Sequence, residues 1–543
     1  MWNTKTNRRE FLTISAMAAA SFAFGCTPSK EGRHVDRLAH KNLGDYPVVV
    51  IGAGLGGLAS AVYLAKAGFP VTLIEQHNIP GGYATAFRRG NYDFDVSLHA
   101  FNLNPRIYQE LGLHERLDRV TLKQCRRLIT PDKDLLLPDA DPEAYLDLMY
   151  SHFPREKEGI RGYVNECFAI FDEVVKISRK GNDLGFLSKM LFFLLYPNMF
   201  GVRNKTLSDL LDDHVKDIEV RGMLCHLCDA FGLPPSRLSG FYYAMITGGF
   251  LKHQPSYIKA RSQDLSNTLS DIIKENNGKM IFGTPVEEIL IKEDRVSGVR
   301  TSDGKVFPAR FVVSNANAPD TFGRFLSSNS TASGYLKELS KYRPSISSFI
   351  VWLGLKGEIR GKIPGCTIYI SPEPDVEKNF KYCNDCDADK SPLNVALYDN
   401  YYKGYSKPGT STLTLMMLSG YEPWRRFEKE YFSGNKARYY QQKNRIAQKL
   451  IQRLEKSLIP DLSKMIDVME ASTPLTNLRY TRNPEGAIYG YPNSIDNSFM
   501  NRIPNTTPVK GLYLAGGWGK FSGSYPGAIM GGRNAFKLIL KDL

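Results

Sequence analysis

The fold of this chain is decided near its start, in the stretch Pro47-Val48-Val49-Val50-Ile51-Gly52-Ala53-Gly54-Leu55-Gly56-Gly57. Its first five residues are an almost continuous β-branched run, the pattern of a strand buried on both faces of a parallel sheet. An Ala-rich helical segment over 58–67 follows and ends at Gly68. With a second strand at 71–74, this order of strand, glycine-rich turn, helix and strand predicts a Rossmann-like unit.

The glycines of this turn have the spacing of a dinucleotide-binding motif. Gly52 permits the tight turn, Gly54 lets the backbone approach a pyrophosphate, and Gly57 lets the helix pack closely on the strand. The N-terminus of the helix offers free N–H groups and a partial positive charge to the phosphates. Glu75 ends the second strand, and we expect its carboxylate to accept hydrogen bonds from the adenosine ribose. The alternative is a glycine-rich turn with a purely structural role.

Two more glycine-containing segments favour FAD over NAD as the cofactor. The pair Gly81-Gly82 lets the backbone meet the far side of a pyrophosphate. Near the C-terminus, a strand and turn over 511–517 precede a helix that opens at 524–529. The N-terminus of that helix would stabilise the negative charge that a flavin ring gains on two-electron reduction. The predicted contacts beyond the first turn are Gly81, Gly82, Thr85, Gly516, Gly517, Gly527, Ala528 and Ile529.

The chain contains one full dinucleotide motif, without a second one in mid-sequence. A pyridine-nucleotide disulfide reductase requires both motifs, so we expect no dedicated NADPH domain. Electrons are then predicted to pass to or from a quinone, oxygen or a protein carrier, unless the flavin serves a redox-neutral isomerisation.

The first 26 residues are predicted to be an export signal. Arg8-Arg9 precede a short apolar stretch over 14–25, the pattern of a twin-arginine signal, and this stretch is too short for an ordinary spanning helix. Cys26 ends a sequence similar to a lipoprotein cleavage site, so a lipid anchor there is an open alternative. We therefore expect export by the twin-arginine route to the periplasm or cell envelope. The competing interpretation is a frayed amphipathic N-terminus.

Composition and charge are those of an ordinary globular protein. Of its 543 residues, 42% are hydrophobic and 23% charged, and its 8 cysteines are too sparse for a disulfide scaffold. The net charge of +14 fits an anionic membrane surface better than nucleic acid, because zinc-finger spacing and an arginine-rich arm are both missing from the sequence. A peripheral membrane contact is predicted, with a merely soluble basic surface as the alternative.

Two sequence features leave alternatives open. The apolar segment 186–200 is typical either of a buried core helix or of a segment that dips into the membrane interface. The C-x-x-C pairs Cys225/Cys228 and Cys383/Cys386 are compatible with a shared zinc site, with disulfides or with unpaired cysteines. Because the two pairs lie beyond the usual finger spacing, we predict no metal site.

Four further blocks, at 81–95, 312–316, 473–476 and 486–490, resemble one flavoprotein family. Together with the C-terminal glycines, they make the chain similar to the phytoene desaturase, carotenoid isomerase and retinol saturase group of the amine-oxidase-like flavoprotein superfamily. The similarity covers most of residues 45–543. It implies FAD-dependent hydride transfer, as desaturation, saturation or isomerisation, on an apolar polyene of the carotenoid or retinoid kind.

The resemblance also implies an α/β fold in which a Rossmann-like FAD-binding domain is interleaved with an α+β substrate domain. By analogy, Val286 would meet the adenine through its backbone. The segment 105–259 has a mostly helical pattern. The expected parts are the signal at 1–26, a linker at 27–44, the FAD-binding domain at 45–104, 260–330 and 476–543, and the substrate domain at 105–259 and 331–475.

Three positions depart from the pattern of the family. Tyr83 stands where many relatives have Arg or Lys, and Gly517 where many members of the wider superfamily have an acid. The missing acid favours the polyene branch over the amine oxidases. Arg261 lies in an Ala-Arg-Ser sequence where Gly-Gly-Ser is frequent, which puts the substrate channel, and with it the substrate, in doubt.

Two residues are candidates for a direct part in the reaction. His99 follows the segment expected beside the flavin, and it is either a proton donor or acceptor or a hydrogen-bonded structural residue. Tyr489 is expected either to line the site and orient the substrate or to be a core aromatic. The rival hypotheses for the whole chain are a flavin amine oxidase and a flavin-binding protein without turnover.

Overall fold

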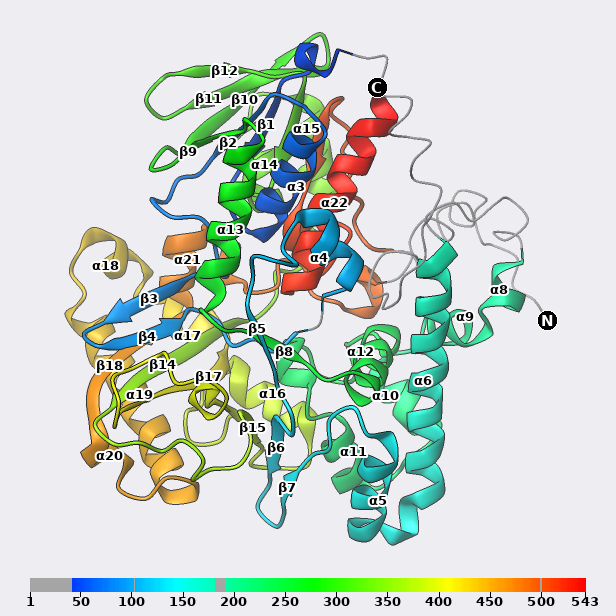
Figure 1. Ribbon diagram of the computed structural model, residues 1–543, viewed down its shortest axis with the longest axis vertical. Helices are drawn as coiled ribbons and strands as arrows, with labels where there is room; N and C mark the ends of the chain where they lie inside the picture. The colour runs from blue at the N-terminus through cyan, green and yellow to red at the C-terminus, as the bar shows by residue number, and fades with distance from the viewer. Residues whose placement is uncertain (1–41, 102, 181–190, 499–500) are drawn as a thin grey trace.

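The computed structural model describes residues 42–101, 103–180, 191–498 and 501–543. The predicted export signal, Cys26 and most of the linker lie outside these ranges. Two sheets organise the described chain, one with five strands and one with seven. Figure 1 shows the five-stranded sheet and its helices in the upper half and the seven-stranded sheet in the lower half. The predicted mixed α/β class is confirmed.

The five-stranded sheet is the one that the opening motif predicts. Its order is β19-β13-β1-β2-β9, and every neighbouring pair is parallel. Three of its strands come from much later parts of the chain, so the sheet is complete only when distant segments meet. The bounds are β1 Val48–Ile51, β2 Val71–Ile74, β9 Lys279–Ile281, β13 Phe311–Ser314 and β19 Leu512–Leu514.

Both faces of this sheet are covered, which is why β1 is apolar throughout. Val48 and Val50 belong to a core cluster with the helices α3, α4 (Pro105–Leu111), α13 and α22, whereas Val49 and Ile51 belong to a cluster with the sheet β10–β12 and the helices α14 and α15. Successive side chains of a strand point to opposite faces, so an alternating polar pattern would bury polar groups here. The bounds are α3 Leu55–Lys66, α13 Ser262–Glu275, α22 Tyr525–Asp542, β10 Val286–Lys292, β11 Arg295–Thr301, β12 Val306–Pro308, α14 Ala318–Gly323 and α15 Ser330–Leu339.

Glycines allow α3 to lie close to α22 and to the turn at Gly516 that precedes it. A Cβ atom on Gly532 would lie 2.3 Å from the carbonyl oxygen of Gly56, and one on Gly56 would lie 2.5 Å from the amide nitrogen of Gly516. No side chain fits at such distances from backbone atoms. Helix α3 and the C-terminal helix α22 are therefore held together by direct backbone contact.

The seven-stranded sheet has the order β18-β14-β17-β16-β15-β6-β7. On one face, Phe349, Leu415 and Val395 pack in a core cluster with the helix α19. On the other face, Ile350 and Met416 line a large cavity. The bounds are β6 Arg126–Ile129, β7 Asp134–Leu136, β14 Ser347–Leu355, β15 Thr367–Ile370, β16 Leu393–Ala396, β17 Ser411–Ser419, β18 Ile466–Ser472 and α19 Ala437–Ser457.

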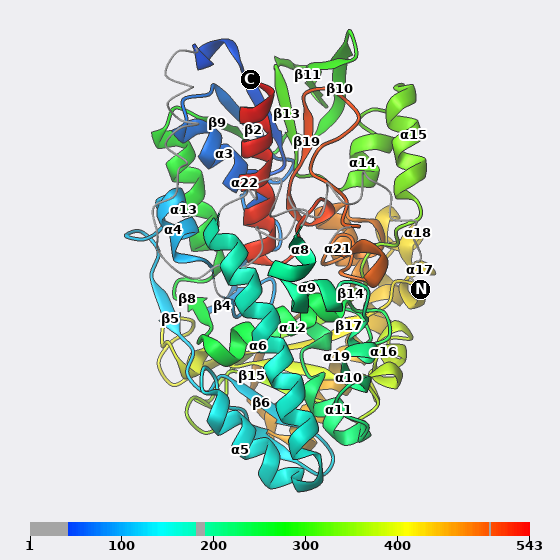
Figure 2. The ribbon, with the colours of Figure 1, turned by 90° about the vertical axis from the view of Figure 1, so that its right-hand side faces the viewer.

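A layer of helices covers the cavity face of this sheet. The long helix α6 (Lys157–Lys180) packs against α12 (Gly240–Lys252), and Figure 2 shows α6 with α8 to α12 around it. The segment 105–259 therefore contains the expected helices, but it also supplies β6 and β7 to the sheet. The mostly helical interpretation missed these strands because three or four residues are too few to show a period.

The apolar segment 186–200 lies partly outside the described ranges. Its described part forms α8 (Phe192–Leu195) and the start of α9 (Pro197–Val202), with Phe192 and Met199 buried. Phe193 and Leu194 are 41% and 64% exposed, so this part is not a wholly buried core helix. Within the described ranges, no helix combines the length and the apolarity needed to cross a bilayer.

The remaining elements are short and connect or cap the two sheets. They are β3 Ala86–Arg89, β4 Tyr92–Asp95, α4 Pro105–Leu111, β5 Arg119–Thr121, α5 Pro142–His152, α10 Leu207–Asp212, α11 Ile218–Leu224, β8 Ser256–Ile258, α16 Val376–Asn384, α17 Glu422–Arg425, α18 Glu428–Ser433, α20 Leu462–Met465 and α21 Pro474–Thr481.

The contact between α3 and α22 can be tested with one added methyl group. We expect Gly532→Ala to lower the free energy of unfolding by about 1–3 kcal/mol, because the new Cβ overlaps the backbone of Gly56. Gly334→Ala on α15 is the matched control, since a Cβ there meets nothing within 4 Å. It should be neutral or stabilise by up to about 1 kcal/mol. Equal urea midpoints for the two variants would contradict the proposed packing constraint.

Candidate functional site

A cavity opens where the parallel strands β1, β2, β13 and β19 end. We call it the nucleotide cavity. Open α/β sheets bind ligands at the carboxyl ends of their strands, because loops and helix N-termini converge there. Most of the predicted cofactor-binding residues line this cavity, namely Gly52, Gly54, Glu75, Gly81, Gly82, Val286, Gly516, Gly517 and Ala528.

Four of the predicted residues lie behind the cavity wall instead. A Cβ atom on Gly57 would lie 2.0 Å from the carbonyl oxygen of Gly52, so this glycine lets the helix close on the turn. The Thr85 hydroxyl donates to the carbonyl of Gly82 at 3.0 Å, and the Gly527 amide donates to the Ser524 hydroxyl at 3.1 Å. Ile529 is fully buried in the core. These residues shape the loops that line the cavity.

Glu75 is held rigidly at the mouth of the first turn. Its carboxylate accepts hydrogen bonds from the backbone N–H of Ala53 at 2.6 Å and of His77 at 2.8 Å. Burial raises its pKa, and these two bonds partly offset the rise. Each carboxylate oxygen accepts more than one bond, so Glu75 can bind ribose hydroxyls without giving up its backbone partners.

Asn315 is a residue of this site that the sequence did not single out by itself. Its amide stands between the two glycine turns, since a Cβ on Gly54 would lie 2.7 Å from Asn315 Nδ2 and one on Gly516 would lie 2.5 Å from Oδ1. Its position in the sequence could have identified it. Asn315 is a polar residue directly after the apolar strand β13, so it lies at the carboxyl edge of the parallel sheet, where ligands bind.

A second and larger cavity adjoins the nucleotide cavity. We call it the apolar cavity. Its floor is the seven-stranded sheet, and residues of α6 and α12 such as Phe171, Met245 and Phe250 form its roof. The two cavities share six lining residues, Tyr83, Ile488, Tyr489, Gly523, Ser524 and Tyr525. A ligand that fills the nucleotide cavity can thus meet a second ligand at this junction.

His99 lines the apolar cavity close to that junction. Its ring is stacked between Tyr257 and Tyr525, with centroids 4.6 and 4.7 Å away. Neither ring nitrogen has a hydrogen-bond partner among the described residues, although the side chain is buried. Burial lowers its pKa, so the imidazole is neutral at pH 7. It therefore keeps one N–H donor and one lone pair free for a ligand.

Tyr489 lines both cavities. Its backbone, together with that of Gly523, leaves no space for a side chain at position 517. The amide of Tyr489 donates to the Ser345 hydroxyl at 2.9 Å. A Cβ on Gly517 would lie 2.8 Å from the Cα of Gly523 and 3.1 Å from the carbonyl oxygen of Tyr489. This leaves no room for the acidic side chain that many members of the wider superfamily carry here.

Arg261, which stands where glycine is frequent in the family, is buried and lines neither cavity. Its guanidinium donates to the Tyr257 hydroxyl at 2.8 Å and to the carbonyl of Asp93 at 2.6 Å, and it lies 3.6 Å from the carboxylate of Asp95. Its backbone has φ 72° and ψ 167°, a region that costs other residues than glycine about 1–3 kcal/mol. The buried ion pair and hydrogen bonds hold this conformation in place.

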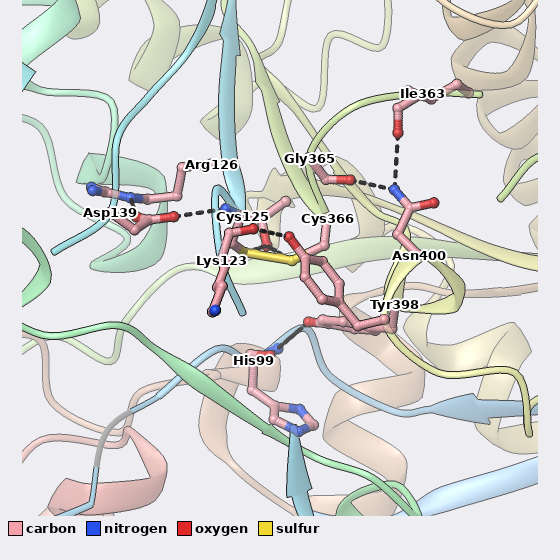
Figure 3. Close-up of a disulfide and its surroundings, with 12 residues drawn as sticks. His99, Lys123, Cys125, Arg126, Asp139, Ile363, Gly365, Cys366, Tyr398 and Asn400 are labelled. Carbon is pink, nitrogen blue, oxygen red and sulfur yellow. Dashed lines mark hydrogen bonds and ion pairs between the residues drawn. A yellow bond between two sulfur atoms is a disulfide. The ribbon is translucent and has the colours of Figure 1, made fainter. Parts of the chain in front are cut away.

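A disulfide forms part of the wall of the apolar cavity. Cys125 and Cys366 precede β6 and β15, which pair in parallel, and their Cα atoms are 4.8 Å apart. Figure 3 shows the bridge beside the carboxylate of Asp139, which accepts from the Cys125 amide at 2.7 Å and from Arg126 Nε at 2.6 Å. The sequence contained no signal for this bridge, because 241 residues separate the two cysteines.

The C-x-x-C cysteines are buried and unbridged. The described part of the chain holds no group of three or more His, Cys, Asp or Glu side chains suited to a metal ion. Neither the shared zinc site nor the disulfides considered for Cys225, Cys228, Cys383 and Cys386 are formed.

A polar cluster lies at the end of the apolar cavity formed by β15 and β6. Arg126 lines the cavity here, and its Nη1 lies 3.4 Å from Nε2 of His226. The Nδ1 of His226 lies 2.9 Å from the carbonyl oxygen of Met223, so Nδ1 carries the hydrogen and Nε2 accepts. Burial and the neighbouring Arg126 lower the pKa of His226 to about 3. Burial raises the pKa of the nearby Asp229 to about 7.

Comparisons with known proteins agree with this architecture. Residues 50–111 match the family of NAD(P)-binding Rossmann-like domains. The chain is 25% identical to prolycopene isomerase 2 of an Oncidium hybrid cultivar, over 87% of this chain and 80% of that protein. It is also 25% identical to all-trans-retinol 13,14-reductase of Danio rerio, over 87% of this chain and 82% of that protein. The resemblance to the carotenoid isomerase and retinol saturase group is confirmed.

Solved structures share the fold. An oxidoreductase from Methanosarcina mazei is 17% identical with a TM-score of 0.59, over 90% of this chain and 100% of that one. Cyclohexylamine oxidase from Brevibacterium oxydans is 16% identical with a TM-score of 0.57, over 92% of this chain and 99% of that one. These likenesses confirm the predicted architecture around a Rossmann-like domain.

His226 makes the stability of the protein depend on pH in a predictable direction. Its pKa rises from about 3 to its ordinary value of about 6.5 on unfolding, so acid favours the unfolded chain, which binds the proton. We expect this residue alone to cost about 2 kcal/mol between pH 7 and pH 5. His99 acts in the same direction, whereas Asp229, whose pKa burial raises to about 7, stabilises the folded protein as the pH falls and opposes both histidines. His226→Gln should therefore make the slope of unfolding free energy against pH less positive, by about 2 kcal/mol over this interval. His152→Gln, at an exposed position, is the control, and an unchanged slope in His226→Gln would contradict the assignment.

Proposed function

Because this chain is an oxidoreductase related to the prolycopene isomerases and retinol 13,14-reductases, we propose that it depends on FAD and transfers hydride to or from an apolar polyene. The reaction is a desaturation, a saturation or an isomerisation of a carotenoid- or retinoid-like substrate. The observation that carries the proposal is the junction of the two cavities, where a nucleotide site with flavoprotein features meets a large apolar site.

The residues of the nucleotide cavity fit FAD. The glycine turn at 52–57 leaves room for a pyrophosphate against the N-terminus of α3, and Glu75 presents an anchored carboxylate for the ribose. The N-terminus of the 18-residue helix α22 lies at the junction, where Ser524 caps it. The partial positive charge of that helix end would stabilise a reduced, anionic ring.

When bound, FAD supplies the centre that accepts or donates hydride, and the chain provides position and surroundings. A substrate held between the roof and the floor of the apolar cavity would displace water from the junction, which would protect charged or reduced species from side reactions. We propose that the neutral imidazole of His99 takes or gives the proton that accompanies hydride transfer. Tyr489 lies against both cavities and orients the substrate at their boundary.

We further propose that the protein is exported by the twin-arginine route and works in the periplasm or cell envelope, with Cys26 as the position of a lipid anchor. The buried disulfide Cys125–Cys366 supports this, because disulfides persist in oxidising compartments. The net charge of +14 supports a peripheral contact with an anionic membrane. A quinone in that membrane, oxygen or a protein carrier would exchange the electrons.

The FAD proposal is tested first by the visible spectrum of the purified protein. We expect a flavin spectrum that dithionite bleaches and that a quinone restores under anaerobic conditions. Restoration by oxygen alone, with hydrogen peroxide formed from amines, would favour an amine oxidase. A flavin that no donor reduces would indicate a binding protein without turnover. A colourless protein that takes up no FAD would refute the proposal.

Glu75 gives a direct test of the adenosine half of the site. We expect Glu75→Ala to weaken FAD binding by about 10-fold or more, because a charged hydrogen-bond acceptor is lost. The matched control is Glu287→Ala, an exposed acid next to Val286, which should leave the dissociation constant unchanged. Flavin fluorescence during equilibrium dialysis measures both variants. Similar dissociation constants for the two would show that Glu75 does not bind the cofactor.

The variant His99→Phe distinguishes a role of His99 in proton transfer from a role in aromatic stacking. Phenylalanine keeps the aromatic stack with Tyr257 and Tyr525 but removes both nitrogens. If His99 moves a proton, we expect kcat to fall about 100-fold or more while the flavin spectrum is retained. Stopped-flow reduction of the bound flavin by a polyene measures this step. A loss of less than about 3-fold would assign His99 a packing role only.

A further inference from the structure

Aromatic rings enclose the imidazole of His99. Tyr257 lies against one face, with centroids 4.6 Å apart and an angle of 23° between the planes, and Tyr525 lies against the other face, at 4.7 Å and 26°. Neither ring nitrogen of His99 has a hydrogen-bond partner among the described residues. Aromatic stacking is weak and tolerates offset rings, so the groups that hold the two tyrosines decide where the free nitrogens point.

Tyr257 supports His99 in two ways. Besides stacking on the imidazole, its ring stacks on that of Tyr398, with centroids 3.9 Å apart and an angle of 14°. The hydroxyl of Tyr398 accepts from the backbone N–H of His99 at 2.9 Å and donates to the carbonyl of the same residue at 2.7 Å (Figure 3). Tyr257 itself is 1% exposed and lines neither cavity, so it lies behind the cavity wall as a support.

The hydroxyl of Tyr257 is held between two opposite charges. It donates to the carboxylate of Asp95 and accepts from Nη1 of Arg261 at 2.8 Å. The same Nη1 lies 3.6 Å from the Asp95 carboxylate, which also accepts from the backbone N–H of Ser262 at 2.8 Å. Hydrogen bonds to charged groups are about twice as strong as those between neutral groups. Arg261 and Asp95 thus fix the ring on which the imidazole of His99 lies.

The guanidinium of Arg261 is itself held from several sides. Its Nη2 donates to the carbonyl of Asp93 on β4 at 2.6 Å and to the hydroxyl of Thr412 on β17 at 3.2 Å. The group also lies over the ring of Tyr405, 3.5 Å from the centroid. The planar fork of an arginine can satisfy these directions together, whereas a lysine ammonium cannot. Arg261 therefore joins the start of α13 to β4 and β17 as a rigid anchor.

The backbone of Arg261 is strained. Its φ of 72° and ψ of 167° suit glycine, which is frequent at this position in the family. A glycine would relieve the strain and would leave no cation to bury. Strain of this kind persists where the surrounding structure enforces it, and it is concentrated at functional sites. An arginine kept under these conditions indicates that its side chain has a role.

We propose that Arg261 is a positioning residue, which holds the hydroxyl of Tyr257 and thereby fixes the plane of the His99 imidazole beside the apolar cavity. The inference rests on the proposed function, in which His99 takes or gives the proton that accompanies hydride transfer. Proton transfer requires that donor and acceptor be aligned within hydrogen-bond reach, so a tilted imidazole would slow that step.

The cation of Arg261 also acts on the charge of the imidazole. Burial lowers the pKa of His99 most, the carboxylate of Asp95 opposes this, and Arg261 adds to the lowering. Loss of Arg261 would leave Asp95 unopposed, so we expect the pKa of His99 to rise. The titratable groups that face His99 from the elements around it are Asp95 on β4, Tyr257 on β8, Arg261 before α13, Tyr398 after β16 and Tyr525 on α22.

Nuclear magnetic resonance of the full-length, FAD-loaded protein, labelled at histidine Cε1, tests the proposal without a substrate. His99→Phe identifies the His99 signal among the 9 histidines. We expect this signal to lie upfield of the others, because two stacked rings shield it. In Arg261→Gly it should move toward the exposed histidines and titrate at higher pH. A signal that keeps both its position and its titration would overturn the proposal.

Two further variants separate geometry from charge. Arg261→Lys keeps a cation beside Asp95, so it remains informative where Arg261→Gly fails to fold, but it lacks the fork that holds the hydroxyl. Its His99 signal should move while the titration stays close to that of the unaltered protein. Tyr257→Phe removes the hydroxyl alone and should move the signal in the same direction. A signal that stays in place in Tyr257→Phe would show that Arg261 does not act through Tyr257 and would overturn the proposal.

The matched control is Arg453→Ala. It removes another arginine that donates to two backbone carbonyls, on α19 at the face of the seven-stranded sheet opposite the apolar cavity. Position and titration of the His99 signal should be unchanged. An equal change in Arg453→Ala would indicate a general loosening of the fold and would contradict the specific role of Arg261.

The outcomes also separate this inference from the proposed function. A small effect of His99→Phe on kcat would refute the proposed role of His99 and, with it, the positioning role of Arg261. A large effect of His99→Phe together with an unchanged His99 signal in Arg261→Gly and Arg261→Lys would refute the inference alone.

Discussion

The structure depends on one steric constraint, the absence of side chains where the first turn of α3 meets the C-terminal segment. Gly56, Gly516 and Gly532 bring backbone atoms into contact there, and a Cβ on Gly56 or Gly532 would fall within 2.5 Å of a backbone atom of the other segment. Because these glycines come from both ends of the chain, the contact closes the five-stranded sheet and fixes the loops at its carboxyl edge. The nucleotide cavity is the space that those loops leave.

Strand register explains how one sheet serves both as a core and as a binding surface. Along β14, Phe349 and Val351 pack against the layer of α19, while Ile350 points into the apolar cavity. A shift of register by one residue would exchange the two sets. The cavity stays open because α6 and α12 cover this face without packing directly onto its side chains. At the edge of the cavity, the disulfide Cys125–Cys366 joins the parallel neighbours β6 and β15.

Two buried arginines are each held by an acid and by hydrogen bonds. Arg261 donates to the carbonyl of Asp93 and lies beside the carboxylate of Asp95, and Arg126 binds Asp139. Each charge is costly to bury alone and is tolerated because its partner and several hydrogen bonds are in place. Truncating one member of either pair would leave an uncompensated charge, so these positions are constrained although they lie outside the junction where chemistry is proposed.

The sequence by itself determined the Rossmann-like unit, the C-terminal helix at the site and most of the residues that line the nucleotide cavity, because local spacing of glycines and apolar runs specifies these features. Glu75 and Gly516 could be identified for this reason. Only the tertiary structure decided which residues form the apolar cavity. Asn315 and the Cys125–Cys366 pair are isolated in the sequence, and they acquire a role through strand pairings between distant segments, which leave no local pattern. The same holds for the short strands β6 and β7, whose place is set by their partners in the sheet rather than by their own residues.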